Sequence, residues 1–135
     1  MLGGMGRRVL AYLILIACVV GVLFVLRSPA LEVQLVVDLS GASRLGDLPL
    51  RRLDVTVLDE DGRYVASTEH SFPPEIYPSG PPVETRPVTL SIRKADYEVE
   101  LEFQYGDTDP PLLRIRRLVV SVKEQGILRL RAAGD

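Results

Sequence analysis

Residues 97–105 read YEVELEFQY, and in this stretch apolar and polar residues alternate without a break. Successive side chains of an extended strand point to opposite faces, so the apolar residues fall on one face and the glutamates and glutamine on the other. This alternation is typical of an antiparallel strand with one face in a hydrophobic core and one in water. The chain beyond residue 30 shows such period-two patterns throughout and little helical periodicity.

The segment Leu112–Lys123 is expected to pair with Tyr97–Tyr105 through a hairpin at Gly106–Pro111. Along this segment the apolar residues change from odd to even positions, so an unbroken ladder would place some of them on the outer face. One extra residue corrects such a change, and we therefore predict a β-bulge at Arg116-Arg117. The predicted register sets Tyr105 opposite Leu113, Phe103 opposite Ile115, Glu102 opposite Arg116, Leu101 opposite Leu118 and Val99 opposite Val120.

Other segments of the chain also have strand character. The turn Asp59-Glu60-Asp61-Gly62 supplies hairpin chemistry, because glycine accepts a positive φ and the acidic side chains accept hydrogen bonds from turn amides. These patterns predict an all-β fold, an antiparallel two-sheet β-sandwich of about seven strands formed by residues 31–135. Besides the two strands above, the expected strands are Glu32–Leu39, Arg52–Asp59, Arg63–Glu69, Val88–Arg93 and Ile127–Arg131.

Two of these segments carry a resemblance to a known group of folds. The strand–turn–strand LDVTVLDEDGRYVAS (Leu53–Ser67) and the later YEVELEF (Tyr97–Phe103) resemble transthyretin-like or carboxypeptidase-regulatory-like β-sandwich domains. In those domains the second segment usually follows a Pro-Gly pair, whereas here Lys94-Ala95-Asp96 precede it. The resemblance implies a fold and no activity, because such sandwiches host many functions.

The N-terminus carries an apolar run. Val9–Leu26 holds eighteen residues without a charge and follows Arg7-Arg8. A helix of this length covers roughly 27 Å at about 1.5 Å per residue, close to the thickness of the hydrocarbon core of a bilayer. We therefore expect a signal anchor: residues 1–8 in the cytoplasm, a transmembrane helix over residues 9–26, a short tether over residues 27–30, and residues 31–135 in the periplasm or outside the cell.

Two alternatives for this run stay open. It could be the apolar region of a signal peptide cleaved after Ser28-Pro29-Ala30, although such regions are normally shorter. It could also belong to a lipoprotein, because Leu15-Ile16-Ala17-Cys18 resembles a bacterial lipobox with Cys18 as the lipidated residue. Against this, Val19–Leu26 stays apolar where lipoproteins usually continue into a polar tether. All three interpretations predict that residues 31–135 are exported from the cytoplasm.

Composition limits the chemistry of the exported part. It carries thirteen Lys and Arg residues against all eighteen Asp and Glu residues, a formal charge of −5, so we expect no nucleic-acid partner. It has no cysteine, which excludes a disulfide, a cysteine-based zinc site and a cysteine nucleophile there.

No motif predicts a reaction, and we expect no catalytic residue, metal or cofactor. Asp59-x-Asp61-Gly62 resembles the start of a calcium loop, but the residues that follow offer no further ligands. His70, the one histidine of the chain, has no Gly-x-Ser-x-Gly nearby and is interpreted as a surface or loop residue.

The segment Phe72–Arg86 holds five prolines and predicts a long extended loop. It is interpreted either as an interaction loop with Phe72, Ile76 and Tyr77 as anchors or as a stiff crossover between the sheets. We expect a non-enzymatic, membrane-anchored interaction module with an envelope protein as partner. The alternative is a carbohydrate- or peptidoglycan-binding domain, which the lack of Trp disfavours.

Overall fold

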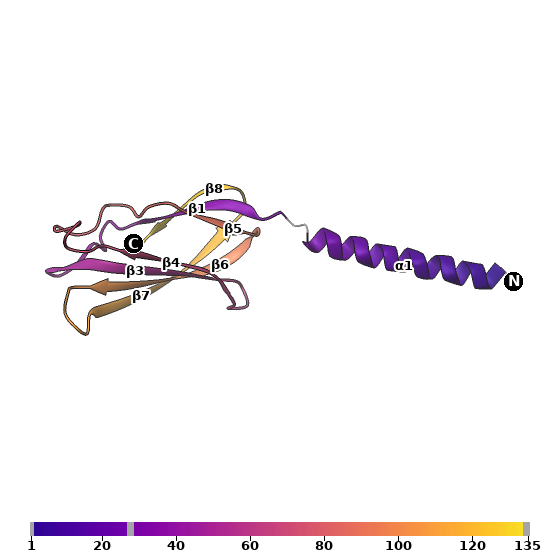
Figure 1. Cartoon of the computed structure of the whole chain (residues 1–135), viewed down its shortest axis with the longest axis horizontal. Coiled ribbons are helices and arrows are strands. Elements are labelled where there is room, and N and C mark those ends of the chain that lie inside the picture. Colours follow the sequence, from indigo (N-terminus) through magenta and orange to yellow (C-terminus); the bar gives the residue numbers. More distant parts are fainter. Residues whose placement is uncertain (1, 27–28, 134–135) are drawn as a thin grey trace.

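The computed structural model describes residues 2–26 and 29–133, which form one helix followed by strands in two sheets (Figure 1). All seven expected strands are present, and an eighth, the two-residue β2, is too short to give a period-two pattern. The elements are α1 (Leu2–Leu26), β1 (Leu31–Asp38), β2 (Arg44–Leu45), β3 (Leu48–Leu58), β4 (Tyr64–Ser71), β5 (Val88–Ile92), β6 (Ala95–Tyr105), β7 (Leu112–Val122) and β8 (Gly126–Arg131).

Helix α1 is long and apolar enough to cross a membrane. Its segment Gly4–Leu23 has a mean hydropathy of 2.0 and is not buried against the rest of the protein. At about 1.5 Å per residue its 25 residues extend over roughly 37 Å. The helix projects from the end of the domain at which β1 begins (Figure 1).

The five-stranded sheet is built around β3. On one edge β3 pairs with β6, which in turn pairs with β7; on the other edge its first residues pair with β2 and the remainder with β4. All of these pairings are antiparallel. Strand β7 therefore lies at one edge of this sheet and β4 at the other.

The three-stranded sheet has the order β5-β1-β8. Strand β1 pairs antiparallel with β5 but parallel with β8, so the expected purely antiparallel arrangement was wrong for one pairing. The reason is topological: after the turn at residues 123–125 the chain does not pair β8 with β7. Instead β8 joins the other sheet beside β1.

The inward faces of the two sheets share one hydrophobic core. Strand β6 shows the expected alternation, with every odd residue from Tyr97 to Tyr105 buried. The expected inward residues of β3 are also buried. The core residues include Val33, Leu35, Val37, Ile92 and Leu130 from the smaller sheet and Leu50, Leu53, Val55, Val57, Val99, Leu101 and Phe103 from the larger.

The predicted bulge at Arg116-Arg117 was wrong. Strands β6 and β7 pair without interruption, with Leu101 opposite Arg116 and Val99 opposite Leu118. The irregularities of this sheet lie elsewhere: Arg51 is an extra residue of β3 between Leu50 and Arg52, and Val65 is an extra residue of β4 between Tyr64 and Ala66. The unbroken ladder leaves two arginines on the inward face of β7 and several apolar residues on its outward face.

Candidate functional site

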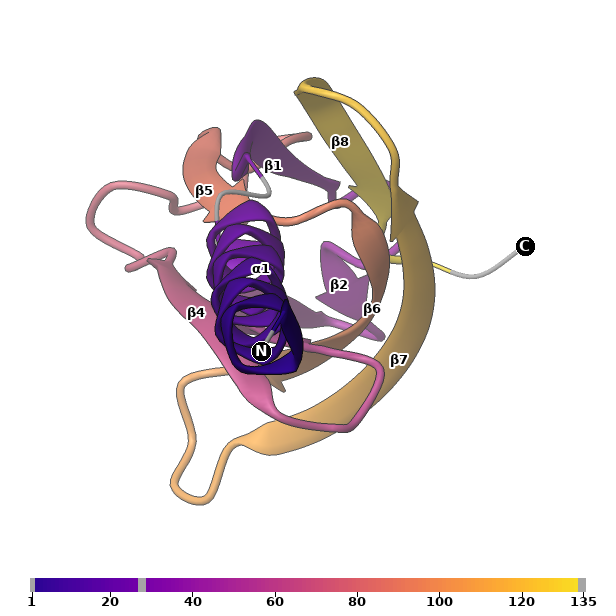
Figure 2. The same ribbon diagram turned by 90° about the vertical axis from the view of Figure 1, so that its right-hand side faces the viewer.

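The two sides of the domain differ in how the sheets meet. Seen along the helix, β4 and β5 lie on one side and β7 and β8 on the opposite side (Figure 2). The proline-rich segment 72–87 joins β4 to β5, whereas residues 123–125 alone join β7 to β8. Outside this turn, nearly all Cα–Cα distances between β7 and β8 exceed 8 Å, too far for the two strands to pair.

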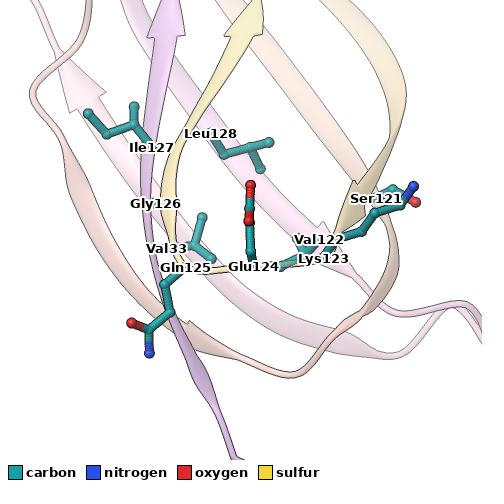
Figure 3. Close-up of a pocket in the computed structure, with 9 residues that line it drawn as sticks. All are labelled: Val33, Ser121, Val122, Lys123, Glu124, Gln125, Gly126, Ile127 and Leu128. Carbon is teal, nitrogen blue, oxygen red and sulfur yellow. The ribbon is translucent and has the colours of Figure 1, made fainter.

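Three adjoining hollows of about 340, 340 and 330 Å³ follow one another along β7: the first at the turn to β8, the second between β7 and β8, and the third between β7, β6 and the residues that follow β8. The first lies at the turn near the helix, and in it Val33 and Leu128 face inward while Gln125 and Ile127 point away (Figure 3). It shares Ser121 and Leu128 with the second, which in turn shares Arg116 and Ala133 with the third. We refer to the three together as the β7–β8 groove.

The floor of the groove is apolar and only half covered. Leu118 and Val120 of β7 and Leu128 of β8 pack against the core but stay partly exposed. At the centre of the core, by contrast, the side chain of Leu101 is fully buried. The groove therefore opens one side of the hydrophobic core to solvent.

The end of the groove far from the helix is basic. Arg44, Arg114 and Arg116 line its third hollow, and no Asp or Glu lines it within the described ranges. The Arg116 guanidinium donates a hydrogen bond of 2.9 Å to the carbonyl oxygen of Ala132, and that of Arg44 donates one of 3.0 Å to that of Ser79. In residues 2–26 and 29–133 none of the three arginines lies within ion-pairing distance of a carboxylate.

Aromatic residues form the wall beneath these arginines. Phe103, directly opposite Arg114 in the ladder, stacks against Tyr105 with ring centroids 6.2 Å apart. The Tyr105 hydroxyl donates a hydrogen bond of 2.7 Å to the carbonyl oxygen of Ala42, which ties β6 to the loop after β1. Burial raises the pKa of this hydroxyl, and Arg114 opposes part of that shift.

The outward face of β7 carries Leu113 and Ile115, which the predicted bulge would have turned inward, together with Val119. Leu113, Ile115 and Val119 are 51%, 59% and 83% exposed. The neighbouring strand β6 presents glutamates on the same face, and Glu98 and Glu100 lie 3.9 and 3.6 Å from the Arg117 guanidinium. Strand β7 thus exposes apolar side chains on an edge with no neighbouring strand among the described residues.

On the opposite side, the three anchors expected in the proline-rich segment are separated by the fold. Phe72 is buried in the core and Tyr77 is half-buried, and their rings meet edge to face at 5.6 Å. Ile76 is 69% exposed. Of the three, Ile76 alone presents most of its side chain to solvent, so an interaction role for this loop stays a prediction centred on that residue.

Polar contacts fasten the same segment to both sheets. The Arg51 guanidinium, on the extra residue of β3, donates hydrogen bonds of 3.0 Å to the Tyr77 carbonyl oxygen and 3.3 Å to that of Phe72. It also lies 3.1 Å from the Asp107 carboxylate. Farther along, the buried Thr85 hydroxyl accepts the Val37 N–H at 3.0 Å. The segment is therefore a fixed crossover between the sheets.

The remaining candidates serve the fold: Asp59 stabilises a turn and His70 lies within a strand. The Asp59 carboxylate accepts hydrogen bonds from the N–H groups of Asp61 and Arg63 at 2.9 and 2.8 Å, so it stabilises the turn as expected. His70 was expected at the surface or in a loop, but it is half-buried on β4 opposite Leu53, and desolvation lowers its pKa. Within the described residues no group of three His, Cys, Asp or Glu side chains could hold a metal ion.

Cys18 lies inside α1, where its side chain is exposed. The helix continues on both sides of it, so the lipobox-like Leu15–Cys18 occupies the middle of the apolar helix.

The groove itself was missed from the sequence, although its signal was present. In LLRIRRLVVSV of β7, Arg114 and Arg116 occupy positions of the same parity as Leu118 and Val120. Arginine on a strand's inward face indicates a place where the core is open, because a long charged side chain must reach water. From the sequence alone, the move of the apolar residues of β7 from odd to even positions predicts a bulge instead.

Comparisons with known proteins give no assignment: no protein-family description, curated protein or solved structure matches this chain.

Proposed function

We propose that the chain is a membrane-anchored, non-enzymatic interaction module of the cell envelope. In this proposal α1 spans the membrane with its N-terminus in the cytoplasm, and the two sheets form a β-sandwich in the periplasm or outside the cell. Arg7 and Arg8 before the apolar run support this orientation, since positive residues are retained on the cytoplasmic side. Only residues 27–30 separate the helix from β1, so the domain would meet its partners close to the membrane surface.

The observation that carries the proposal is the exposed β7 edge. A long edge strand with apolar side chains is a template for pairing with another chain, and monomeric proteins usually protect such edges with charges, prolines or short strands. The eleven residues of β7 include three arginines but no proline, and Leu113, Ile115 and Val119 point outward. Exposed apolar patches are typical of interaction sites, and this supports the proposal.

Site-specific photo-crosslinking in native membranes tests the proposal. A photoreactive residue at Ile115, 59% exposed on β7, is expected to form a crosslink to an envelope protein. The matched control is Tyr64, 66% exposed on β4 at the opposite edge of the same sheet, where we expect no such crosslink. Equal crosslinking at both positions, or none at Ile115, would refute the proposal.

The mode of attachment has its own test. Mass spectrometry of the N-terminus of the purified protein is expected to show an intact chain that begins at Met1. A chain that begins at Leu31 would indicate a cleaved signal peptide, and one that begins at a lipidated Cys18 would indicate a lipoprotein.

A further inference from the structure

We propose that the β7–β8 groove accepts an extended segment of a partner protein as an inserted strand, with apolar residues at alternate positions and carboxylates at the end that reaches Arg44, Arg114 and Arg116. This inference rests on the proposed function, because it specifies the partner chemistry for the same surface. Four features of the groove support it: its width, its two free edges, its floor and its charge.

The width of the groove leaves room for a strand. Paired strands lie about 4.8 Å apart, so a strand inserted between two others separates them by roughly 9.6 Å. Nearly every Cα atom of β7 lies more than 8 Å from all Cα atoms of β8, a separation that an intervening strand requires, and residues of both strands line the same hollow. Neither strand has a second neighbour on the groove side among the described residues. An inserted segment could therefore satisfy the backbone groups of both edges at once.

The groove floor favours an inserted strand with apolar residues at alternate positions. Leu118, Val120 and Leu128 face the interior and stay half exposed, so apolar side chains at every second position of an inserted strand would complete the core there. The other side chains would point outward, beside Val119 on β7 and Arg129 on β8.

The charge selects an acidic segment. Strands β7 and β8 together contain five arginines and no Asp or Glu, in a domain whose formal charge is −5. Arg117 contacts Glu98 and Glu100, and Arg129 lies 3.1 Å from Glu84, but Arg44, Arg114 and Arg116 reach no carboxylate within the described residues. Charge-assisted hydrogen bonds to carboxylates are the contacts that arginine guanidinium groups make best.

The two ends of the groove differ, and this difference orients the segment. Glu124 lies in the first hollow at the turn, while the arginines line the last. Strands β7 and β8 run in opposite directions along the groove. An inserted strand is therefore parallel to one of them and antiparallel to the other.

A second copy of this chain is a poorer occupant. Two β7 edges in contact would bring arginines against arginines, which is unfavourable. The acidic alternating strand of this protein, β6, is already paired on both edges with β3 and β7 and is not free to enter another groove.

The test measures peptide binding to the full chain in detergent micelles by fluorescence anisotropy. The probes are two labelled ten-residue peptides of alternating valine and threonine, one with two aspartates at its N-terminus and one with two at its C-terminus. At least one is expected to bind about tenfold more tightly than its counterpart with lysines in place of the aspartates. N-methylation of alternate residues, which removes backbone donors, is expected to abolish binding.

Two double variants distinguish binding at the groove from a general effect of the protein's charge. Arg114→Gln with Arg116→Gln should weaken binding by about tenfold or more, since each charge-assisted contact is worth on the order of one tenfold step. Arg63→Gln with Arg86→Gln removes the same charge at exposed positions outside the groove and should leave binding unchanged. Arg114→Glu with Arg116→Glu should instead bind the lysine peptide, a gain that misfolding cannot produce.

Several outcomes would overturn the inference: equal binding of the aspartate and lysine peptides, equal loss in both glutamine variants, or unchanged binding after N-methylation. A crosslink from Ile115 to a second copy of the chain would also overturn it. If no peptide binds but Ile115 still crosslinks to an envelope protein, the inference fails and the proposed function stands. If the crosslink to an envelope protein is also missing, the proposed function fails as well.

Discussion

On one side of the domain the chain uses sixteen residues to pass from β4 to β5, whereas on the other it uses three to pass from β7 to β8. The long connection places Phe72 in the core, and its backbone accepts hydrogen bonds from Arg51. The short connection covers nothing, and Leu118, Val120 and Leu128 stay half exposed. In this domain the long connection adds a side chain to the core, and the short connection leaves apolar side chains half exposed to solvent.

The largest difference between the two sides should appear on truncation of a core residue. Phe72→Ala is expected to lower the free energy of unfolding by about 3–5 kcal/mol, because it leaves a cavity in a closed region. Leu118→Ala on the groove floor should cost only about 1–2 kcal/mol, because its side chain is already half exposed. Urea unfolding of the full chain in detergent, followed by tyrosine fluorescence, measures both. Equal losses would show that the two sides are equally closed.

The next prediction concerns the hydrogen bonds that hold the segment 72–87 against β3. Arg51→Met should cost about 1–3 kcal/mol, because it removes the guanidinium that bonds the Phe72 and Tyr77 carbonyl oxygens, of which Tyr77 keeps the Gly80 N–H as a donor. The control is Asp107→Asn, which removes an exposed partner of the same guanidinium and should change stability by less than about 0.5 kcal/mol. The same unfolding assay applies. A larger loss in the aspartate variant would mean that the ion pair, and not the loop contact, is what Arg51 contributes.

A smaller effect depends on pH. Burial lowers the pKa of His70 below its usual 6.5, so the folded state favours the neutral imidazole. The resulting stability is present above about pH 6.5 and is lost as the pH falls through the lower folded pKa. Between pH 7.5 and pH 5.5 the unmodified chain should therefore lose more stability than His70→Gln. Parallel slopes for the two proteins would show that His70 does not contribute.

The smallest effect on stability is expected on the open side. Val119→Lys places a charge on a side chain that is 83% exposed, so the free energy of unfolding should change by less than about 0.5 kcal/mol. Crosslinking from Ile115 should nevertheless fall sharply, because the charge obstructs the docking edge. Strong destabilisation by this substitution would mean that Val119 serves the fold and not a partner.

Local patterns in the sequence predicted the strands well and their assembly less well. The alternation in Tyr97–Tyr105 was enough to predict which face of β6 is buried. The same rule failed for β7, because it assumes that every apolar residue turns to the core. Arg114 and Arg116 face inward there because the ladder with β6 is unbroken and the space beside them is open.

What the sequence could not provide depends on contacts between distant segments. The parallel pairing of β1 with β8 depends on which sheet β8 joins after the turn, and no residue pattern specifies that choice. Likewise, Phe72 has the same chemistry as a core residue or as an exposed anchor, and its burial depends on how the start of the crossover packs against the sheets.

Amide hydrogen exchange of the full chain, measured with and without the aspartate peptide, tests the central claim most directly. If the β7–β8 groove accepts an inserted strand, the peptide should protect backbone amides in both β7 and β8 and leave β4 and β5 unchanged. Protection on the β4–β5 side, or in β7 without β8, would contradict the account.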